Sequence, residues 1–326
     1  MNVADSVIQV TAPSRIHFGL MSFGQASWKQ FGGVGLMVEP PCCRLSFESA
    51  DQLEISGDQS DRVHDIVDRW SDATRWGSDL RCRIHVHQTL RPHSGLGSGT
   101  QLALSVAAGL NRFFRLPYKG PDDLARSVSR ARRSTVGTYG FFHGGLIWES
   151  GKSGPDGTSR LEQRVVLPSS WRILLICRRR GHGMFGEGEQ HAFDRVAPVP
   201  TDISTSLKNE VAGHMLPAAR EGRFQDFSES VYRYGHRAGM CFSGVQGGPF
   251  ADAWQEQLIQ RLRSWNLPGV GQSSWGPTVF AFTENERIAD DFAARLRDDP
   301  RTADTDITIS RPNDCGARIE VLNASC

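Results

Sequence analysis

Apolar and polar residues recur along the chain with two different periods, and each period predicts a different element. Residues 7–10 and 15–21, on either side of Pro13, are rich in apolar side chains and predict a pair of strands. Residues 44–47 and 81–87 alternate apolar and polar side chains, as a strand with one buried face does. The first part of the chain therefore begins with strands.

A helical period follows a glycine-rich loop at residues 92–99. Apolar Leu102, Val106 and Leu110 recur at helical spacing and predict a helix over residues 100–114. A second helix is expected from Pro121, because two aspartates follow in its first turn. The polar, glycine-rich stretch at 149–159 predicts a hairpin or an exposed loop.

The second half mixes the two periods. The patterns predict strands over 172–177, 278–282, 305–310 and 317–322, and helices over 203–219, 224–235, 251–264 and 285–297. Strands and helices do not alternate in a regular β-α-β order, so the expected class is α+β. We expect two domains, residues 1–165 and residues 166–326.

Composition narrows the function classes. The chain has 326 residues with 39% hydrophobic residues, which is typical of a globular protein of about two domains. Its 37 basic and 36 acidic residues leave a formal net charge of +1. A general polyanion binder is far more basic, so we expect no nucleic-acid partner.

The cysteines and the N-terminal residues indicate the cellular compartment in which the protein is expected. Seven cysteines are scattered with no C-x-x-C pair, which excludes a zinc ribbon and fits a reducing environment. The first ten residues lack the basic and apolar regions of a signal peptide. The longest apolar run, at 173–177, is far shorter than the ~20 residues of a membrane span. We therefore expect a cytoplasmic protein that does not span a membrane.

The glycine-rich loop predicts an anion site. Glycines let backbone N–H groups approach a phosphate, and the helix that follows adds unpaired donors. The candidate phosphate-binding residues are Ser94, Gly95, Leu96, Gly97, Ser98, Gly99 and Thr100. The loop has neither the G-K-[ST] ending of a P-loop nor the dinucleotide fingerprint. A plain strand-to-helix turn with Ser98 or Thr100 as cap is the alternative.

Three stretches together resemble the GHMP kinase superfamily. Residues 92–100 are similar to its second signature, residues 12–19 to its N-terminal signature, and residues 269–277 to its C-terminal glycine loop. The resemblance implies an N-terminal half like domain 2 of ribosomal protein S5 and a ferredoxin-like C-terminal half. It also implies a site between the two halves.

The sequence departs from the kinases of that superfamily in two places. Gly99 stands where the signature has its second serine, and a hydroxyl follows at Thr100. Many of the kinases carry an aspartate in the segment that corresponds to 136–145, yet no acidic residue occurs from Arg126 to Gly145. The signature serines of the kinases help to hold metal and phosphate, so the first departure alters that geometry. Phosphoryl transfer to an alcohol needs a base, so the second departure disfavours it.

Residues 14–20 and 136–145 resemble one branch, the β-ribofuranosylaminobenzene 5′-phosphate synthases. This resemblance implies a pentosyltransferase that joins 4-aminobenzoate to 5-phosphoribosyl 1-pyrophosphate (PRPP) in tetrahydromethanopterin biosynthesis. Carbon dioxide and pyrophosphate are the other products. It further suggests a homodimer, and Mg²⁺ is expected because pyrophosphate leaving groups travel with it.

The remaining candidate site residues follow from the same segments. We expect substrate contacts from Arg15, His17, Gly137, Thr138, Tyr139, Gly271, Ser273 and Ser274. His182 and Glu187, on a glycine-rich loop after a strand, are candidate acid–base groups. Residues 178–180 are three arginines that could clamp an anion.

Plainer interpretations accompany these assignments. Arg15 is equally compatible with a surface ion pair, His17 with a structural histidine, and residues 182–189 with a solvated loop. Arg126, Arg130, Arg132 and Arg133 are interpreted as a solvated helix face. His85 and His87 share a strand face with no third ligand in view, so no metal ligands are assigned.

Two other functions stay open from the sequence. The first is an ATP-dependent small-molecule kinase of the same superfamily, which turnover of ATP with a sugar or isoprenoid alcohol would favour. The second is a nucleic-acid-binding protein that uses an S5-like half, for which binding should depend steeply on salt.

Overall fold

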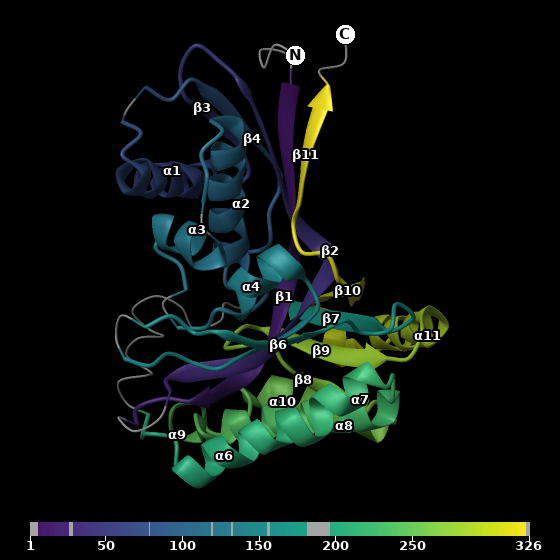
Figure 1. The fold of residues 1–326 in the computed structure, drawn as a ribbon. Coiled ribbons are helices and arrows are strands. Elements are labelled where there is room, and N and C mark those ends of the chain that lie inside the picture. Colours follow the sequence, from purple (N-terminus) through teal and green to yellow (C-terminus); the bar gives the residue numbers. More distant parts are fainter. Residues whose placement is uncertain are drawn as a thin grey trace.

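Two long strands form the centre of the molecule. The computed structural model describes residues 6–25, 29–77, 79–118, 120–131, 133–154, 157–180 and 196–323. Strand β1 (Ser6–Ser22) pairs antiparallel with β2 (Phe31–Ser49). Both run through the whole molecule, from the part that holds α1–α3 to the part that holds α6–α10 (Figure 1). The strand order is β11-β1-β2-β10-β7-β9-β8.

The expected break at Pro13 is wrong, because β1 continues through it. The register instead shifts between Pro13 and Ser14, where Pro13 faces Cys42 and Ser14 faces Val38 of β2. Proline has no N–H to donate, so a register irregularity is one of the few places where a paired strand tolerates it. The two predicted strands are therefore one.

The first part of the chain adds short strands and helices to this pair. Strand β4 pairs with β2 and β3, and β5 pairs with β2 and β6. The strands are β3 (Glu54–Gly57), β4 (Cys82–Gln88), β5 (Leu146–Glu149) and β6 (Leu161–Val165). The helices are α1 (Ser60–Thr74), α2 (Ser98–Phe113), α3 (Pro121–Ser127) and α4 (Val136–His143). The predicted hairpin at 149–159 is confirmed as the β5–β6 connection.

The second part contributes the other strands and most of the helices. The strands are β7 (Arg172–Arg178), β8 (Val270–Gln272), β9 (Thr278–Thr283), β10 (Thr305–Pro312) and β11 (Arg318–Asn323). The helices are α6 (Thr201–Glu210), α7 (Leu216–Arg220), α8 (Phe224–Met240), α9 (Ser243–Gln246), α10 (Ala253–Ser264) and α11 (Glu286–Arg297). A π-helical turn, η2 (Val211–Met215), joins α6 to α7, where one helix is predicted, and η3 (Pro300–Thr302) is a 3₁₀ turn.

Strands β7 and β9 are buried on both faces. Ile173 and Phe282 belong to a cluster with residues of α6–α8, whereas Leu174 and Ala281 belong to a cluster with residues of α10 and α11. A third cluster places α1–α3 against β1, β2 and β4. Burial on both faces explains the continuous apolar run at 173–177.

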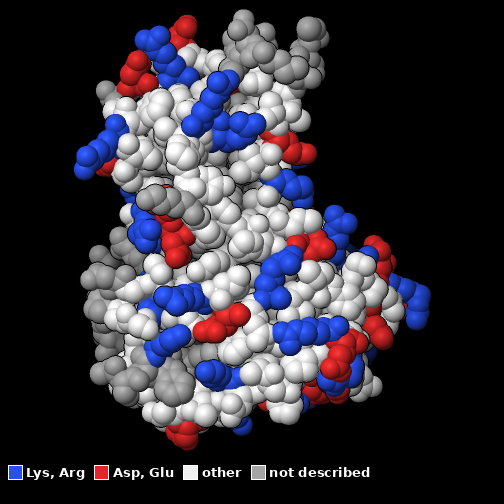
Figure 2. Space-filling model, viewed as in Figure 1, with Lys and Arg blue, Asp and Glu red and all other residues white. Residues whose placement is uncertain are grey.

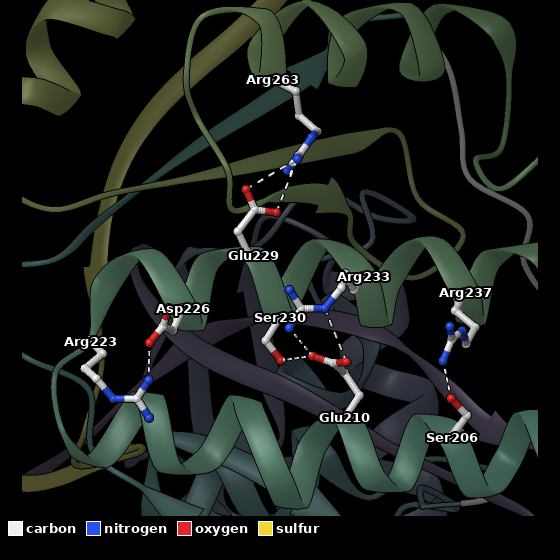
Figure 3. A network of polar contacts seen from close by, with 9 residues as sticks. All are labelled: Ser206, Glu210, Arg223, Asp226, Glu229, Ser230, Arg233, Arg237 and Arg263. Carbon is white, nitrogen blue, oxygen red and sulfur yellow. Dashed lines mark hydrogen bonds and ion pairs between the residues drawn. The ribbon is translucent and has the colours of Figure 1, made fainter.

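Polar contacts tie the helices of the second part together (Figure 3). Glu210 of α6 accepts hydrogen bonds from Ser230 Oγ at 2.6 Å and from Arg233 Nη2 at 2.7 Å, both on α8. Arg263 of α10 contacts Glu229 of α8 at 3.2 Å. These bridges fix α8, whose opposite face packs on β1 and carries part of the site described below.

The expected α+β class is confirmed, since one mixed sheet carries helices from both halves of the chain. The expected domain boundary near residue 165 falls between β6 and β7. The chain crosses back over that point, because β10 pairs with β2 and β11 pairs with β1.

The helix lengths and the surface charges complete the description of the fold. Among the described residues, no helix is both long and apolar enough to cross a membrane. On the face shown in Figure 2, basic and acidic side chains are interspersed.

Candidate active site

A cavity of about 820 Å³ opens between β1, the start of α2, the segment 129–134, and helices α8 and α9. Four sequence-predicted residues line it: Arg15, His17, Thr100 and Ser274. The cavity is therefore built where the three signature-like stretches of the sequence come together.

Hydrogen bonds join those three stretches directly. The backbone N–H of His17 donates to Ser273 Oγ at 3.0 Å, and that hydroxyl donates to the carbonyl of Gly95 at 2.7 Å. The carbonyl of His17 in turn accepts from the N–H of Ser274 at 3.0 Å. Ser273 is fully buried, so its role is to hold the stretches in register.

The glycine loop has the conformation that its sequence predicts. Gly95 and Gly97 have φ angles of 84° and 75°, which side chains disfavour. A Cβ on Gly95 would lie 2.3 Å from the carbonyl oxygen of Ser273. Gly97 is the N-cap of α2, so the unpaired N–H donors of that helix begin directly after the loop.

Most loop side chains serve the fold. Ser94 is buried and donates to the carbonyl of Arg91 at 2.8 Å, and Leu96 packs into the core of β1, β2 and β7. Ser98 is the first residue of α2. Thr100, the third residue of α2, is the side chain of this loop that lines the cavity.

Arginines occupy the space beside Gly99. A Cβ on Gly99 would lie 3.4 Å from guanidinium nitrogens of both Arg130 and Arg62. Arg130 and Arg133 line the cavity, and the Nη1 of Arg15 donates to the Gly95 carbonyl at 3.2 Å. Burial is the largest influence on Arg62 and lowers its pKa. The start of α2 is thus surrounded by cationic groups.

The interpretation of Arg130 and Arg133 as a solvated helix face is wrong. Helix α3 ends at Ser127, and the backbone then turns, with φ of 56° at Ser129 and 62° at Ala131. Helical periodicity therefore stops before these arginines, and the turn directs them to the cavity. Arg126, still in α3, is exposed and lies 4.0 Å from Asp123.

His17 is held in one tautomer. Its Nδ1 accepts a hydrogen bond from the N–H of Gly19 at 3.2 Å, so the ring hydrogen is on Nε2, 3.2 Å from Ser134 Oγ. Burial, and then the nearby Arg15, lower the pKa of His17 well below its ordinary value. The imidazole is neutral and donates to Ser134, a lining residue that the sequence analysis missed.

The segment 137–139 sits beside the loop. A Cβ on Gly137 would lie 3.4 Å from Thr100 Cγ2, and the Gly137 carbonyl accepts from Gln101 Nε2 at 2.9 Å. Thr138 is buried. The Tyr139 hydroxyl donates to the carbonyl of Ser159 at 3.0 Å, and burial raises its pKa. These three residues support the start of α4 and are absent from the described lining of the cavity.

Other candidates lie elsewhere. A Cβ on Gly271 would lie 2.7 Å from the ring of Phe280, which shows a packing role. Arg178 pairs with Asp252 at 3.0 Å and Arg179 with Asp306 at 2.8 Å, away from the cavity. His182 and Glu187 lie outside the described residues.

A buried carboxylate that the sequence analysis did not single out lies at the start of α4. Glu149 of β5 is fully buried, and its Oε2 accepts from the N–H of Thr135 at 2.7 Å and from the Thr135 hydroxyl. Thr135 is the N-cap residue of α4. A carboxylate there satisfies a helix terminus, and Glu149 is not among the lining residues.

Metal-ligating side chains do not cluster in the described part of the chain. No group of three or more His, Cys, Asp or Glu side chains occurs among them in a metal-binding arrangement, and none of the described lining residues is a carboxylate. Mg²⁺ is bound in proteins through one or two carboxylates together with substrate phosphates. The described wall offers guanidinium and hydroxyl groups instead.

The remaining wall of the cavity is uncharged and largely apolar. It is formed by α8, α9 and the loops at 249–250 and 275, with Phe242, Phe250 and Trp275 as its aromatic side chains. Phe242 and Trp275 meet edge to face with their ring centroids 4.7 Å apart. The cavity therefore has one cationic side and one aromatic side.

Comparison with known proteins agrees with this geometry. The model of the GHMP kinases N terminal domain matches residues 63–145. The chain is 26% identical over 297 residues to beta-ribofuranosylphenol 5′-phosphate synthase of Methanothermobacter thermautotrophicus, covering 85% of this chain and 89% of the relative. It is also 26% identical to the Archaeoglobus fulgidus protein of that name, over 97% and 100% of the two chains.

Solved structures share the fold. Mevalonate-3-kinase from Thermoplasma acidophilum superimposes with a TM-score of 0.66 at 15% identity, covering 97% of this chain and 99% of that one. A putative homoserine kinase from Listeria monocytogenes gives 0.65 at 14% identity, covering 96% and 99%.

The fold and the glycine loop at the start of α2 thus define a protein with the GHMP kinase architecture. Within that architecture, the sequence is similar to the β-ribofuranosylphenol 5′-phosphate synthases, and residues 63–145 match the N-terminal domain of the GHMP kinases. The resemblance inferred from the sequence is confirmed.

Proposed function

We propose that the chain is a β-ribofuranosyl 5′-phosphate synthase, which joins PRPP to a 4-substituted benzoate and releases carbon dioxide and pyrophosphate. The observation that carries the proposal is the cationic side of the cavity, where Arg15, Arg130 and Arg133 meet the start of α2 without a described carboxylate among the lining residues. The names of the relatives support the same reaction class.

The bond changes need little acid–base help. The C1–O bond of the ribose breaks and its electrons leave with pyrophosphate. The ring carbon that carries the carboxylate attacks C1 and forms a carbon–carbon bond. The electron pair of the carboxylate bond then restores the aromatic ring as carbon dioxide departs. No proton has to be removed from the acceptor at the carbon that reacts.

The residues of the cationic side fit the first of these changes. Charge grows on the leaving pyrophosphate, and preorganised donors aimed at developing charge are an effective form of catalysis. The guanidinium groups of Arg62 and Arg130 beside Gly99, with the N–H donors of α2, supply such donors. The neutral His17 donates to Ser134 and holds that hydroxyl in place.

The same observation disfavours an ATP-dependent kinase. A kinase of this fold would need a group to accept the proton of the substrate alcohol. The lining residues that are described include no carboxylate, and His17 already donates its one ring hydrogen to Ser134 while Gly19 occupies its other nitrogen. Among the described lining residues, neither wall therefore offers a base.

The aromatic acid is the open choice within the reaction. The sequence resemblance implies 4-aminobenzoate, whereas the relatives' name places a phenol in the product. The two acids differ only in the group opposite the carboxylate, an amine or a hydroxyl. The experiment is incubation of the protein with PRPP, Mg²⁺ and each acid, with mass spectrometry of the ribosylated product. A product from neither acid would contradict the proposal.

Four further predictions accompany the reaction. Mg²⁺ is expected to enter with PRPP, because the described wall has no carboxylate to hold it. Tetrahydromethanopterin biosynthesis is the expected pathway. The six free cysteines among the described residues favour a reducing, cytoplasmic location. A homodimer is expected from the family resemblance and is testable by light scattering.

A further inference from the structure

We propose that the aromatic side of the cavity binds the ring of the acid, and that Gln246 accepts a hydrogen bond from the group opposite the carboxylate. This inference rests on the proposed function and deepens it. The amine or hydroxyl distinguishes these acids from benzoate. The inference names the side chain that recognises this group.

The walls of this side suit a flat apolar ring. Phe242, Phe250 and Trp275 line it, and each is at most 9% exposed. Phe242 is fixed from two directions, by Trp275 and by Phe23, each with its ring centroid 4.7 Å away. Aromatic rings held in this way contribute both apolar area and edge-to-face contacts to a bound ring. None of the described lining residues of α8, α9 and the loops at 249–250 and 272–275 is charged.

Helix α8 keeps the space between these rings open. Gly235, Ala238 and Gly239 line the cavity at helical spacing. A Cβ on Gly235 would meet only the carbonyl oxygen of Phe18, at 3.4 Å, so a larger side chain would extend into open volume. A Cβ on Gly239 would lie 2.0 Å from the carbonyl oxygen of Pro249. The absence of side chains therefore both leaves the ring space free and lets the segment with Phe250 approach the helix.

The orientation of the Gln246 amide is fixed by its neighbours. One end of the amide lies 3.2 Å from the carbonyl of Gly239 and 3.0 Å from the carbonyl of Gly248. Carbonyl oxygens only accept, so that end is the NH₂ group and both of its hydrogens are used. The Oε1 of Gln246 is left as an acceptor with no donor among the described residues, in a side chain that lines the cavity.

The second glutamine in the wall, Gln272, has hydrogen-bond partners at both ends of its amide. Gln272 Oε1 accepts from the N–H of Ala251 at 2.6 Å, and its Nε2 donates to the carbonyl of Ser274 at 2.6 Å. Both ends of Gln272 are therefore committed to the fold. Of the two lining amides, only that of Gln246 has an oxygen with no hydrogen-bond donor among the described residues.

The reaction fixes the direction of the acid. The ring carbon that carries the carboxylate forms the bond to ribose C1, so it must face the cationic side, where PRPP is proposed to bind. The group opposite the carboxylate then points to the aromatic side. An amine and a hydroxyl are both hydrogen-bond donors, which matches the acceptor that Gln246 offers.

The test measures binding rather than turnover. Calorimetric titration, in the presence of Mg²⁺ and inorganic pyrophosphate, compares 4-aminobenzoate, 4-hydroxybenzoate and 4-methylbenzoate, the last of which has the same shape without a donor. We expect the first two to bind about tenfold more tightly than the third, as one hydrogen bond provides. Gln246→Leu should bring the three dissociation constants to within about twofold of one another.

Two variants make the result interpretable. Gln260→Leu, on the exposed face of α10, is the matched control and should retain the tenfold preference. Phe242→Leu should weaken all three acids by a similar factor, because it removes ring contact without touching the amide. A preference that survives in Gln246→Leu would overturn the inference, as would the absence of saturable binding of all three acids to the unmodified protein.

The outcome separates this inference from the proposed reaction. Product formation together with an unchanged binding preference in Gln246→Leu would refute the role of Gln246 and support the synthase reaction. If Gln246→Leu abolishes the binding preference but no product forms from PRPP, the aromatic-acid site would be supported and the synthase reaction refuted.

Discussion

His17 lies in the wall of the cavity with both ring nitrogens engaged, one by the N–H of Gly19 and one by Ser134. The arrangement requires a neutral ring, because Nδ1 must accept. Burial, the larger cause, and the charge of Arg15 both lower its pKa, in agreement with that requirement. The sequence was compatible with either a structural role or a substrate contact for His17. In the structure this histidine is buried and also lines the cavity.

The first prediction concerns pH. Since the folded pKa of His17 lies below the unfolded value of about 6.5, the unfolded chain binds more protons at mildly acid pH. Stability should therefore fall as pH drops from 7.5 to 5.5, by up to about 1.4 kcal/mol per pH unit from this residue. Urea unfolding at both pH values should show a smaller loss in His17→Gln. His64→Gln, exposed on α1, controls for removal of an imidazole, and an equal change in both variants would contradict the account.

The second prediction concerns the arginines of the cationic side. Arg130→Gln and Arg133→Gln should each raise the KM for PRPP about ten- to a hundredfold, the effect of losing a charge-assisted hydrogen bond. The KM for the aromatic acid should change much less. Arg126→Gln removes an arginine that is exposed on α3 and should leave both values near those of the unmodified protein. Equal effects of Arg126→Gln and Arg130→Gln would argue against the assignment.

At the scale of elements, the start of α2 has glycine at position 99, where the superfamily signature has a serine. The position of a Cβ on Gly99 is 3.4 Å from the guanidinium nitrogens of Arg62 and Arg130, an ordinary contact for one carbon. A longer or branched side chain would enter the space of those groups. Glycine at position 99 therefore leaves the space beside the start of α2 to the two arginines.

The third prediction follows from that spacing. Gly99→Val should raise the KM for PRPP about tenfold, because its methyl groups displace guanidinium groups. Crowding of this kind costs about 1–3 kcal/mol. Gly99→Ala should stay within about twofold. Steady-state kinetics and urea unfolding of both variants check the expectation. A valine variant with the KM of the unmodified protein would show that the arginines do not act at this point.

The elements were largely predictable, and the site only in part. Strong periods gave α2, β4 and α11, since burial on one face leaves a regular pattern. The pattern could not show that β1 passes through Pro13, because the compensating irregularity lies in the distant strand β2. The position of Arg130 and Arg133 in the cavity wall could not be predicted for a related reason. Backbone turns at Ser129 and Ala131 end the helix without a glycine or proline to mark its end in the sequence.

Across the whole molecule, the site depends on contacts between segments far apart in the chain. Ser273, Gly95 and His17 are joined by two hydrogen bonds that span 256 and 178 residues. Motif similarity could locate the three segments, but only the fold shows which side chains face the cavity. The aromatic residues Phe242 and Phe250 belong to no motif, so sequence reasoning had no signal for them beyond apolarity.

The whole cavity is consistent with one reaction: a polyanion on the side of α2, an aromatic ring on the side of α8, and bond formation between them. The most direct test supplies an aromatic acid labelled at its carboxyl carbon, as 4-aminobenzoate and as 4-hydroxybenzoate in turn, with Mg²⁺ and folded protein, and measures released carbon dioxide with and without PRPP. The account predicts release from at least one acid that requires PRPP and falls at least tenfold in Arg130→Gln at low PRPP concentration. Folded protein that releases no label from either acid, or releases it equally without PRPP, would contradict it.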